Sequence, residues 1–242
     1  MGSKNRYAKY ILPIILKDRK PNQWYVEPFV GGFNMIDKVT GLRLANDSHY
    51  YLIQLFRAIQ NGWVPPDNVY EQEYISIRDN LKRLENCNYP AHLIGFIGFG
   101  CSFSGKWFGG YARSFDRQGL PRNHCLESKT NILKQAPKLK GIVIENKNYL
   151  DLVIPDNSII YCDPPYQNTT KYSFQQPYEL ATKFNHEIFW DWVRELARNG
   201  HKVFVSEYSA PNDFECVWSK EVVSNLDVTA TGKKNIERLF TL

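Results

Sequence analysis

Four consecutive residues, Asp163, Pro164, Pro165 and Tyr166, directly follow the apolar run 158–162, which we expect to form a buried strand. A loop that leaves the carboxyl end of a strand is where α/β proteins place ligands. The two prolines fix φ and remove two backbone donors, so the local carbonyls are left as outward-facing acceptors. A carboxylate and a carbonyl can accept both N–H bonds of an aromatic amino group, which favours the pyramidal nitrogen that attacks a methyl donor. Tyr166 supplies a flat face on which a base can stack; the structural alternative for the four residues is a rigid Asp-Pro turn.

A second group of candidate residues surrounds the expected strand 24–30, which ends at Gly31 and Gly32. Glycines in such a turn let the backbone approach a bound cofactor closely, because no Cβ obstructs it. Asp47 follows another short strand, 42–45. A carboxylate there can accept hydrogen bonds from both hydroxyls of a ribose, as in dinucleotide-binding folds. The alternative role of Asp47 is to cap a helix over 48–60.

Positive charge is concentrated in one part of the chain. The net charge is +5, and the segment 101–140 alone contains eight basic and two acidic residues. Within it, Lys106 and Arg113 are interleaved with Trp107 and Tyr111, so basic groups can neutralise phosphates while aromatic rings stack on bases or wedge between them. A localised basic surface of this kind is typical of a phosphate-binding protein. The alternatives are a solvated charged face and a small aromatic core formed by Phe96, Phe99 and Phe103.

The composition argues against several classes of protein. No apolar run approaches the ~18 residues needed to span a bilayer, and the polar, basic N-terminus does not resemble a signal peptide, so we expect a cytoplasmic protein. The five cysteines are scattered and never form a C-x-x-C pair, which argues against a disulfide framework and a zinc site. The five histidines are scattered too. We therefore expect no metal.

Strands and helices alternate at both ends of the chain, which predicts an α/β fold with a mainly parallel sheet. The expected helices cover 48–60 and 185–198, with Leu52, Ile53, Phe56 and Ile59 on the apolar face of the first and Ile188, Phe189, Trp192, Val193 and Leu196 on that of the second. The expected strands cover 24–30, 42–45, 141–145, 158–162, 201–206, 215–222 and 237–242. The middle is less regular, with a helix near 75–84 and a stretch rich in glycine and aromatics at 95–111. We interpret 1–61 and 140–242 as one catalytic domain, and 62–139 as a smaller, mostly helical inserted domain for target recognition.

These motifs resemble those of the Dam-type (D12 class, α-group) DNA N6-adenine methyltransferases of phages and orphan bacterial systems. Residues 163–166 look like the DPPY motif of amino-group methyltransferases, and 27–32 resemble the motif written E-P-F-x-G-x-G, with the second glycine displaced. The order of cofactor segments, insertion and DPPY is that of the same group. The resemblance covers nearly the whole chain, and it implies a Rossmann-like class I methyltransferase fold that uses S-adenosylmethionine.

Carried over residue by residue, the resemblance implies two further sets of residues. The residues expected to bind the cofactor are Lys4, Tyr7, Glu27, Pro28, Phe29, Gly31, Gly32, Asp47, Asn148, Tyr149 and Asp163. The residues expected to bind DNA are Ser104, Lys106, Trp107, Tyr111, Arg113, Arg117, Lys171 and Tyr172. The segment 103–113 departs from the N-G-L-x-R-x-N pattern of enzymes that read GATC, so GATC is only one candidate target.

The sequence thus predicts a site-specific DNA adenine methyltransferase that flips its target base into the DPPY pocket, acts as a monomer or weak dimer on duplex DNA, and is typical of restriction-modification enzymes. Two alternatives stay open. One is a methyltransferase acting on cytosine N4, on RNA or on a protein amide. The other is a catalytically inactive DNA-binding homologue.

Overall fold

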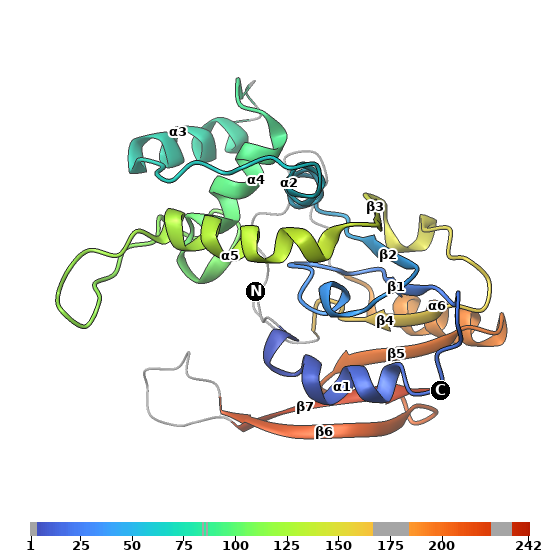
Figure 1. Ribbon diagram of the computed structural model, residues 1–242. Helices are drawn as coiled ribbons and strands as arrows, with labels where there is room; N and C mark the ends of the chain where they lie inside the picture. The colour runs from blue at the N-terminus through green and yellow to red at the C-terminus, as the bar shows by residue number, and fades with distance from the viewer. Residues whose placement is uncertain (1–3, 84, 86, 167–183, 224–233) are drawn as a thin grey trace. The chain divides into compact units, whose positions relative to one another are not determined.

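The computed structural model describes residues 4–83, 85, 87–166, 184–223 and 234–242. These residues form two compact units (Figure 1). The helical unit contains the described residues of 47–146, and the sheet unit contains the described residues of 3–46, 147–171 and 183–242. Each unit is described by itself below.

The sheet unit contains six of the seven strands that the described residues form: β1 (Tyr25–Glu27), β2 (Arg43–Asn46), β4 (Ile159–Cys162), β5 (Lys202–Glu207), β6 (Glu215–Val223) and β7 (Lys234–Thr241). Their order across the sheet is β2-β1-β4-β5-β7-β6. The first four strands are parallel, and β7 runs antiparallel to both of its neighbours. The predicted α/β class with a mainly parallel sheet is confirmed.

Two α-helices, α1 (Ala8–Ile15) and α6 (His186–Arg198), accompany this sheet, together with the short 3₁₀ helices η1 (Lys4–Arg6), η2 (Ile36–Lys38) and η4 (Tyr149–Asp151). Asn185 caps α6 by accepting hydrogen bonds from the backbone N–H groups of Glu187 and Ile188. The buried face of α6 is formed by Phe189, Trp190, Val193 and Leu196, which pack into the core with strand residues such as Val26, Ile160 and Val205. The prediction that Ile188 belongs to this face is wrong: its side chain is 47% exposed because Trp190 takes the inward position.

The helical unit contains α2 (Tyr50–Gln60), α3 (Glu71–Lys82), α4 (Ala91–Gly100), η3 (Phe103–Gly105), α5 (His124–Leu139) and the strand β3 (Ile142–Glu145). The predicted apolar face of α2 is buried as expected. Helices α2 and α4 cross closely at Gly95, where an added Cβ would lie 2.2 Å from the carbonyl oxygen of Tyr51. A glycine is therefore required at this crossing.

The start of α2 differs from the expectation. The helix begins at Tyr50, and its N-cap is His49, whose Nδ1 accepts from the backbone N–H of Leu52 at 3.3 Å. Asp47 lies outside the helix, and its Oδ1 accepts from the backbone N–H of His49 at 2.9 Å. The predicted N-cap role of Asp47 is therefore wrong, because the aspartate orders the residue that caps the helix instead of capping it directly.

Candidate active site

A buried ion cluster lies at the carboxyl end of β4, where Asp163 leaves the strand. The ammonium of Lys4, on η1, lies 3.1 Å from Oδ1 of Asp163 and 2.9 Å from Oε1 of Glu237, on β7. Because β7 is antiparallel to β5, its early residues lie beside the carboxyl end of β5, as the pairing of Glu207 with Arg238 shows. Three segments that are distant in sequence therefore meet at one edge of the sheet. The side chain of Asp163 remains 23% exposed, so it is accessible from outside the cluster.

Tyr166 is oriented by the same cluster. Its hydroxyl donates to Oε1 of Glu237 at 2.5 Å, and the ammonium of Lys4 donates to that hydroxyl. The ring also makes an edge contact with Tyr208, with the centroids 4.7 Å apart. Of the two prolines between Asp163 and Tyr166, Pro164 is buried and Pro165 is half-buried.

The charges of the cluster perturb one another. Burial disfavours the ammonium of Lys4, but the carboxylates of Asp163 and Glu237 outweigh it and raise the pKa of Lys4 above its usual value. Burial raises the pKa of Asp163, the ammonium of Lys4 opposes this, and the nearby charge of Glu237 adds to it, so that the net pKa is raised. Asp163 is thus a carboxyl group that binds a proton more readily than one in water.

Glu27 ends β1 and is fully buried. Its Oε1 accepts from the hydroxyl of Tyr25 at 2.9 Å. Burial raises the pKa of Glu27 well above its usual value, and the hydrogen bond from Tyr25 only partly offsets this effect. The carboxyl group that the sequence suggested as a cofactor ligand therefore makes its hydrogen bond inside the sheet unit and favours the protonated form.

The turn after β1 is fixed by a buried asparagine. Asn46, at the end of β2, donates from Nδ2 to the carbonyls of Pro28 at 3.0 Å and Lys147 at 3.1 Å, and its Oδ1 accepts from the backbone N–H of Lys147 at 2.9 Å. In the turn itself Gly31 has φ +50°, and a Cβ there would meet no atom within 4 Å. The open space at Gly31 is what a turn that approaches a ligand requires.

Three half-buried aromatic rings lie beside this turn. The ring of Phe29 is 5.1 Å from that of Tyr149 and 5.8 Å from that of Phe184, and the last two are 5.8 Å apart. Asn148 starts η4, with its Oδ1 accepting from the backbone N–H of Leu150 at 3.1 Å. Partly open aromatic faces next to an unobstructed glycine turn fit the purine of a nucleoside cofactor.

The structure brings most, but not all, of the predicted cofactor residues into the sheet unit. Tyr7 is buried, with its ring centroid 6.0 Å from that of Trp218. Asp47 belongs to the helical unit, so its predicted hydrogen bonds to a ribose stay a prediction. Lys171 and Tyr172 lie outside the described residues. Three residues of the site were not among the site residues predicted from the sequence: Asn46, Phe184 and Glu237.

In the helical unit, two aromatic residues expected to bind DNA take part in internal packing. The ring of Trp107 lies 4.5 Å from that of His49 and is stacked on Tyr51 at 5.4 Å. An added Cβ at Gly98 would come within 2.3 Å of Trp107, so the glycine makes room for the indole. The hydroxyl of Tyr111 donates to the carbonyl of Val69 at 2.7 Å. The aromatic-core alternative therefore describes much of this segment: Phe96 is buried and Phe99 half-buried, but the prediction that Phe103 belongs to the core is wrong, since Phe103 is 60% exposed.

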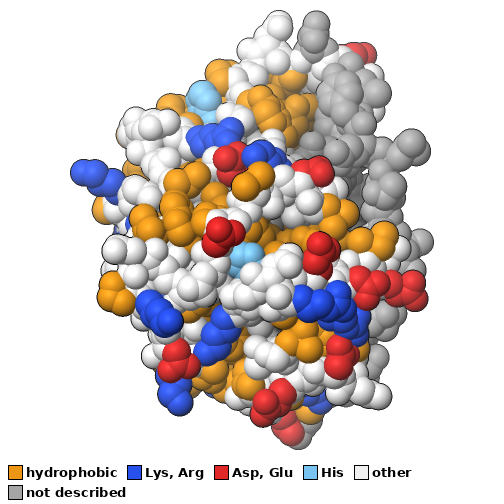
Figure 2. Space-filling model, turned by 90° about the vertical axis from the view of Figure 1, so that its right-hand side faces the viewer, with side chains coloured by type: hydrophobic (Ala, Val, Ile, Leu, Met, Phe, Trp, Pro, Cys, Tyr) orange, Lys and Arg blue, Asp and Glu red, His pale blue; other side chains and the backbone are white. Residues whose placement is uncertain are grey.

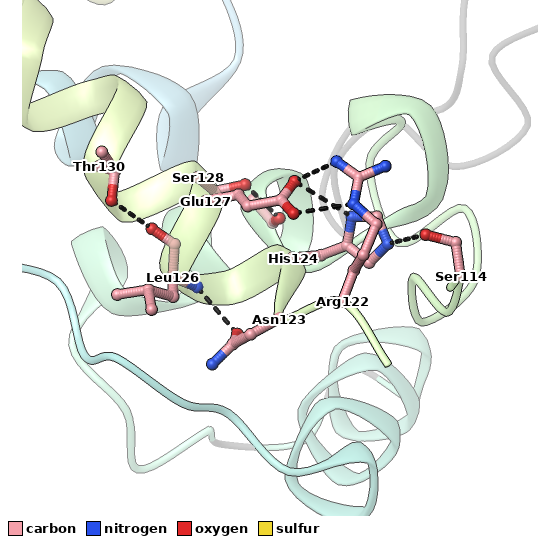
Figure 3. Close-up of polar contacts among 9 residues, drawn as sticks. Ser114, Arg122, Asn123, His124, Leu126, Glu127, Ser128 and Thr130 are labelled. Atoms are coloured by element: carbon pink, nitrogen blue, oxygen red, sulfur yellow. Dashed lines mark hydrogen bonds and ion pairs between the residues drawn. The ribbon is translucent and has the colours of Figure 1, made fainter. Parts of the chain in front are cut away.

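Several cations of the basic segment are paired with acids of their own unit. Arg113 forms an ion pair with Glu71, and Lys129 lies 2.7 Å from Asp67. Figure 3 shows the start of α5, where the guanidinium of Arg122 makes two hydrogen bonds to the carboxylate of Glu127. In the same view Asn123 accepts from the backbone N–H of Leu126 at 2.9 Å, and His124 contacts Ser114 at 2.8 Å.

An exposed turn at 116–120 precedes α5 in the same segment. Asp116 closes it by accepting from the backbone N–H groups of Gln118 and Leu120 at 2.8 and 2.9 Å. Arg117 is exposed in the turn, between the exposed side chains of Phe115 and Leu120. Ser104 and Lys106 are also exposed. The turn and the residue before it thus expose one cation and two apolar side chains within six consecutive residues.

Basic side chains also gather on the sheet unit. An open hollow of roughly 680 Å³ is lined by Asn5, Arg6, Ala8, Lys9, Leu12, Pro13, Leu16 and Lys38. Three of these residues are cationic, and Arg6 is only two residues from Lys4. By contrast, basic and acidic side chains are interspersed on the face drawn in Figure 2.

Among the described residues, no group of three or more His, Cys, Asp and Glu side chains is arranged to hold a metal ion. In the same part of the chain, no helix combines the length and the apolar character needed to cross a membrane. A comparison with protein families matches residues 1–93 and 108–232 to the model described as D12 class N6 adenine-specific DNA methyltransferase. The match includes both the glycine turn and residues 163–166.

Proposed function

Because the chain belongs to the D12 class N6 adenine-specific DNA methyltransferase family, we propose that it methylates the N6 amino group of an adenine in duplex DNA, using S-adenosylmethionine, with the base flipped out of the helix. The observation that carries this proposal is the position of Asp163 and Pro164 at the carboxyl end of β4, with the carboxyl partly exposed and its charge balanced by Lys4. The carboxylate of Asp163 and the carbonyl of Pro164 are the two acceptors that we propose for the amino group at the end of β4.

The proposed chemistry assigns one task to each group. Asp163 and the carbonyl of Pro164 accept the two N6–H bonds, which concentrates the nitrogen lone pair toward the methyl donor. The cofactor supplies an electrophilic methyl group on a sulfonium. As N6 is alkylated it must lose a proton, and the raised pKa of Asp163 makes its carboxylate a suitable first acceptor. The ammonium of Lys4, 3.1 Å from Oδ1 of Asp163, favours the ionised form of this carboxyl before the reaction. Most of the rate enhancement then comes from positioning, which can supply about 7–11 kcal/mol.

For the cofactor, we propose that the purine contacts the rings of Phe29, Tyr149 and Phe184, and that the backbone at Gly31 lies against the ligand. The half-buried state of all three rings and the empty space at the missing Cβ of Gly31 support this placement. Asp47 is proposed to bind the ribose hydroxyls through its carboxylate, whose Oδ1 also accepts from the backbone N–H of His49.

For DNA, we propose that Lys106 and Arg117 of the helical unit neutralise phosphates, together with Arg6 and Lys9, which line the hollow of the sheet unit. Flipping a base costs a few kcal/mol of pairing and stacking, which contacts to the distorted duplex must offset. The exposed apolar groups beside Arg117 can wedge into such a duplex. We assign catalysis to the sheet unit and sequence reading to the helical unit.

Transfer of a tritiated methyl group, followed by analysis of the modified base, tests the proposal. Wild-type protein is expected to produce N6-methyladenine in duplex DNA; N4-methylcytosine, or transfer to RNA alone, would contradict it. Asp163→Ala is expected to abolish turnover and to leave duplex affinity largely intact. Asp156→Ala, an exposed aspartate of the same unit, serves as the matched control. A protein that binds DNA but gives no heat with S-adenosylmethionine in calorimetry would instead be an inactive homologue.

A further inference from the structure

Glu237 uses a single carboxylate oxygen for two of the contacts that define the site. Its Oε1 accepts from the hydroxyl of Tyr166 at 2.5 Å and lies 2.9 Å from the ammonium of Lys4. The side chain is buried, at 9% exposure, so both contacts are made away from bulk water. The same ammonium reaches Asp163 at 3.1 Å. Glu237 therefore contacts Tyr166 directly and is linked to Asp163 through the ammonium of Lys4.

We propose that Glu237 is a positioning residue for methyl transfer, which holds the ring of Tyr166 and shares the charge of Lys4 with Asp163. This inference rests on the proposed function, since it concerns the same site. Glu237 does not touch the reacting atoms; it acts through Tyr166 and Lys4.

The first part of this role is geometric. A tyrosine whose only polar atom is fixed by a buried carboxylate cannot rotate about its side-chain bonds without losing that hydrogen bond. The edge contact with Tyr208 constrains the same ring from another side. Because the stacking platform is already held in one orientation, the ring of Tyr166 loses less entropy when the flipped base docks on it. Tyr166 thus owes its orientation to a residue 71 positions later in the chain.

The second part is electrostatic. The groups that shift the pKa of Asp163 are the ammonium of Lys4, the carboxylate of Glu237 and the hydroxyl of Tyr166. The charge of Asp163 in turn raises the pKa of three buried neighbours: Tyr161 and Cys162 on β4, and Glu27 on β1. Without Glu237, Lys4 would pair with Asp163 alone, and a neighbouring negative charge would be lost. Both changes lower the pKa of Asp163 and make it a weaker proton acceptor. Glu237 therefore limits how far the ammonium of Lys4 lowers the pKa of Asp163.

The variant Glu237→Gln separates these effects from folding. Its amide oxygen can still accept from Tyr166, but it carries no charge. With wild-type activity established, we expect a kcat lowered about tenfold or more, up to the order of 10²-fold typical of a small misplacement. KM for DNA and for the cofactor should stay within about twofold, and the acid limb of the kcat profile should move to lower pH because Asp163 ionises more easily. Glu195→Gln, an exposed glutamate on α6, is the matched control.

A second variant keeps the inference falsifiable. Glu237→Leu removes the acceptor, and Tyr166→Phe retains the ring but removes the hydroxyl. Because both changes break the same hydrogen bond, the double variant Glu237→Leu/Tyr166→Phe should lose less activity than the product of the single losses. Multiplicative losses, or an acid limb that stays in place, would show that Glu237 only stabilises the fold. An unchanged kcat would overturn the inference while leaving the methyltransferase activity itself intact. Absence of transfer by the wild type would overturn the proposed function, and with it this inference.

Discussion

The ammonium of Lys4 lies 3.1 Å from Oδ1 of Asp163, which joins the first described turn of the chain to the loop that follows β4. The lysine and the aspartate are both residues that the sequence associates with the site. Their contact means that the aspartate is held as one partner of a buried network. The catalytic carboxyl proposed here is therefore tuned by an ion pair, and the N-terminal segment is part of the site.

Replacing Lys4 by methionine is expected to destabilise the protein and to do so more at high pH. The change leaves Asp163 and Glu237 as neighbouring carboxyls without their shared cation, and breaking a buried pair in this way costs about 3–5 kcal/mol. We expect the lower end of that range, because Asp163 is 23% exposed. Urea unfolding at about pH 5 and about pH 8 measures the loss, which should shrink in acid because the raised pKa of Asp163 lets this carboxyl bind a proton.

The control for this variant is Lys202→Met, which removes the exposed ion pair with Asp18 and should cost less than about 1 kcal/mol. Equal losses for Lys4→Met at the two pH values would show that repulsion between the two carboxyls plays no part.

Glu27 is expected to make the folded protein less stable as the pH rises. Its pKa is raised in the folded state by burial, so the folded state binds this proton more tightly than the unfolded state. The resulting stabilisation is complete below the ordinary carboxyl pKa and is lost as the pH rises through the raised value. Glu27→Gln keeps an acceptor for Tyr25 but cannot ionise. The free energy of unfolding of this variant, relative to wild type, should therefore increase with pH, whereas the exposed Glu195→Gln should show no trend.

The parts of the fold that could be predicted from the sequence are those whose burial leaves a periodic pattern. Helix α2 and the strand β4 show this, since their apolar residues face a core. Helix α5 was not predicted as a single helix, because only Cys125 and Leu139 of its sixteen residues are buried and it carries no clear apolar stripe. Helix α4 was not predicted because it is rich in glycine, a poor helix former; Gly95 is required by the close crossing of α2, and Gly98 makes room for Trp107.

In the site, residues adjacent to a linear motif could be predicted, whereas residues brought in by sheet pairing could not. Asp163 and Tyr166 belong to one short motif, but Glu237 reaches them only because β7 folds back antiparallel to β5. The sequence predicted the two last strands, 215–222 and 237–242, but not the antiparallel pairing that places the start of β7 at the carboxyl edge. The number of cations in 101–140 that can meet DNA was overestimated for a similar reason. Arg113 and Lys129 pair with Glu71 and Asp67, which lie outside this range in the sequence.

Substitution of Gly31 by alanine is expected to reduce the affinity for S-adenosylmethionine beyond its effect on stability. The residue has φ +50°, so a Cβ adds strain of about 1–2 kcal/mol, and that Cβ would project into the open space proposed for the cofactor. Gly200, which follows α6 with φ +87°, is the matched control because Gly200→Ala carries similar strain away from the site. Calorimetric titration should show weaker binding only for Gly31→Ala. Equal affinities for the two variants would place the cofactor elsewhere.

The salt dependence of duplex binding is expected to reveal which cations contact phosphates. Each phosphate contact contributes a slope of about −0.9 to log K against log salt. We expect each of two double variants to reduce the magnitude of the slope by about 1.8 if both of its cations contact phosphates. One is Lys106→Gln/Arg117→Gln in the helical unit, and the other is Arg6→Gln/Lys9→Gln at the hollow of the sheet unit. Lys202→Gln, whose charge lies at the amino end of β5, should leave the slope unchanged. Binding titrations from low to moderate salt provide the measurement. A slope that responds to Lys202 as strongly as to either pair would indicate non-specific attraction by the net charge, and the proposed contact surfaces would then be wrong.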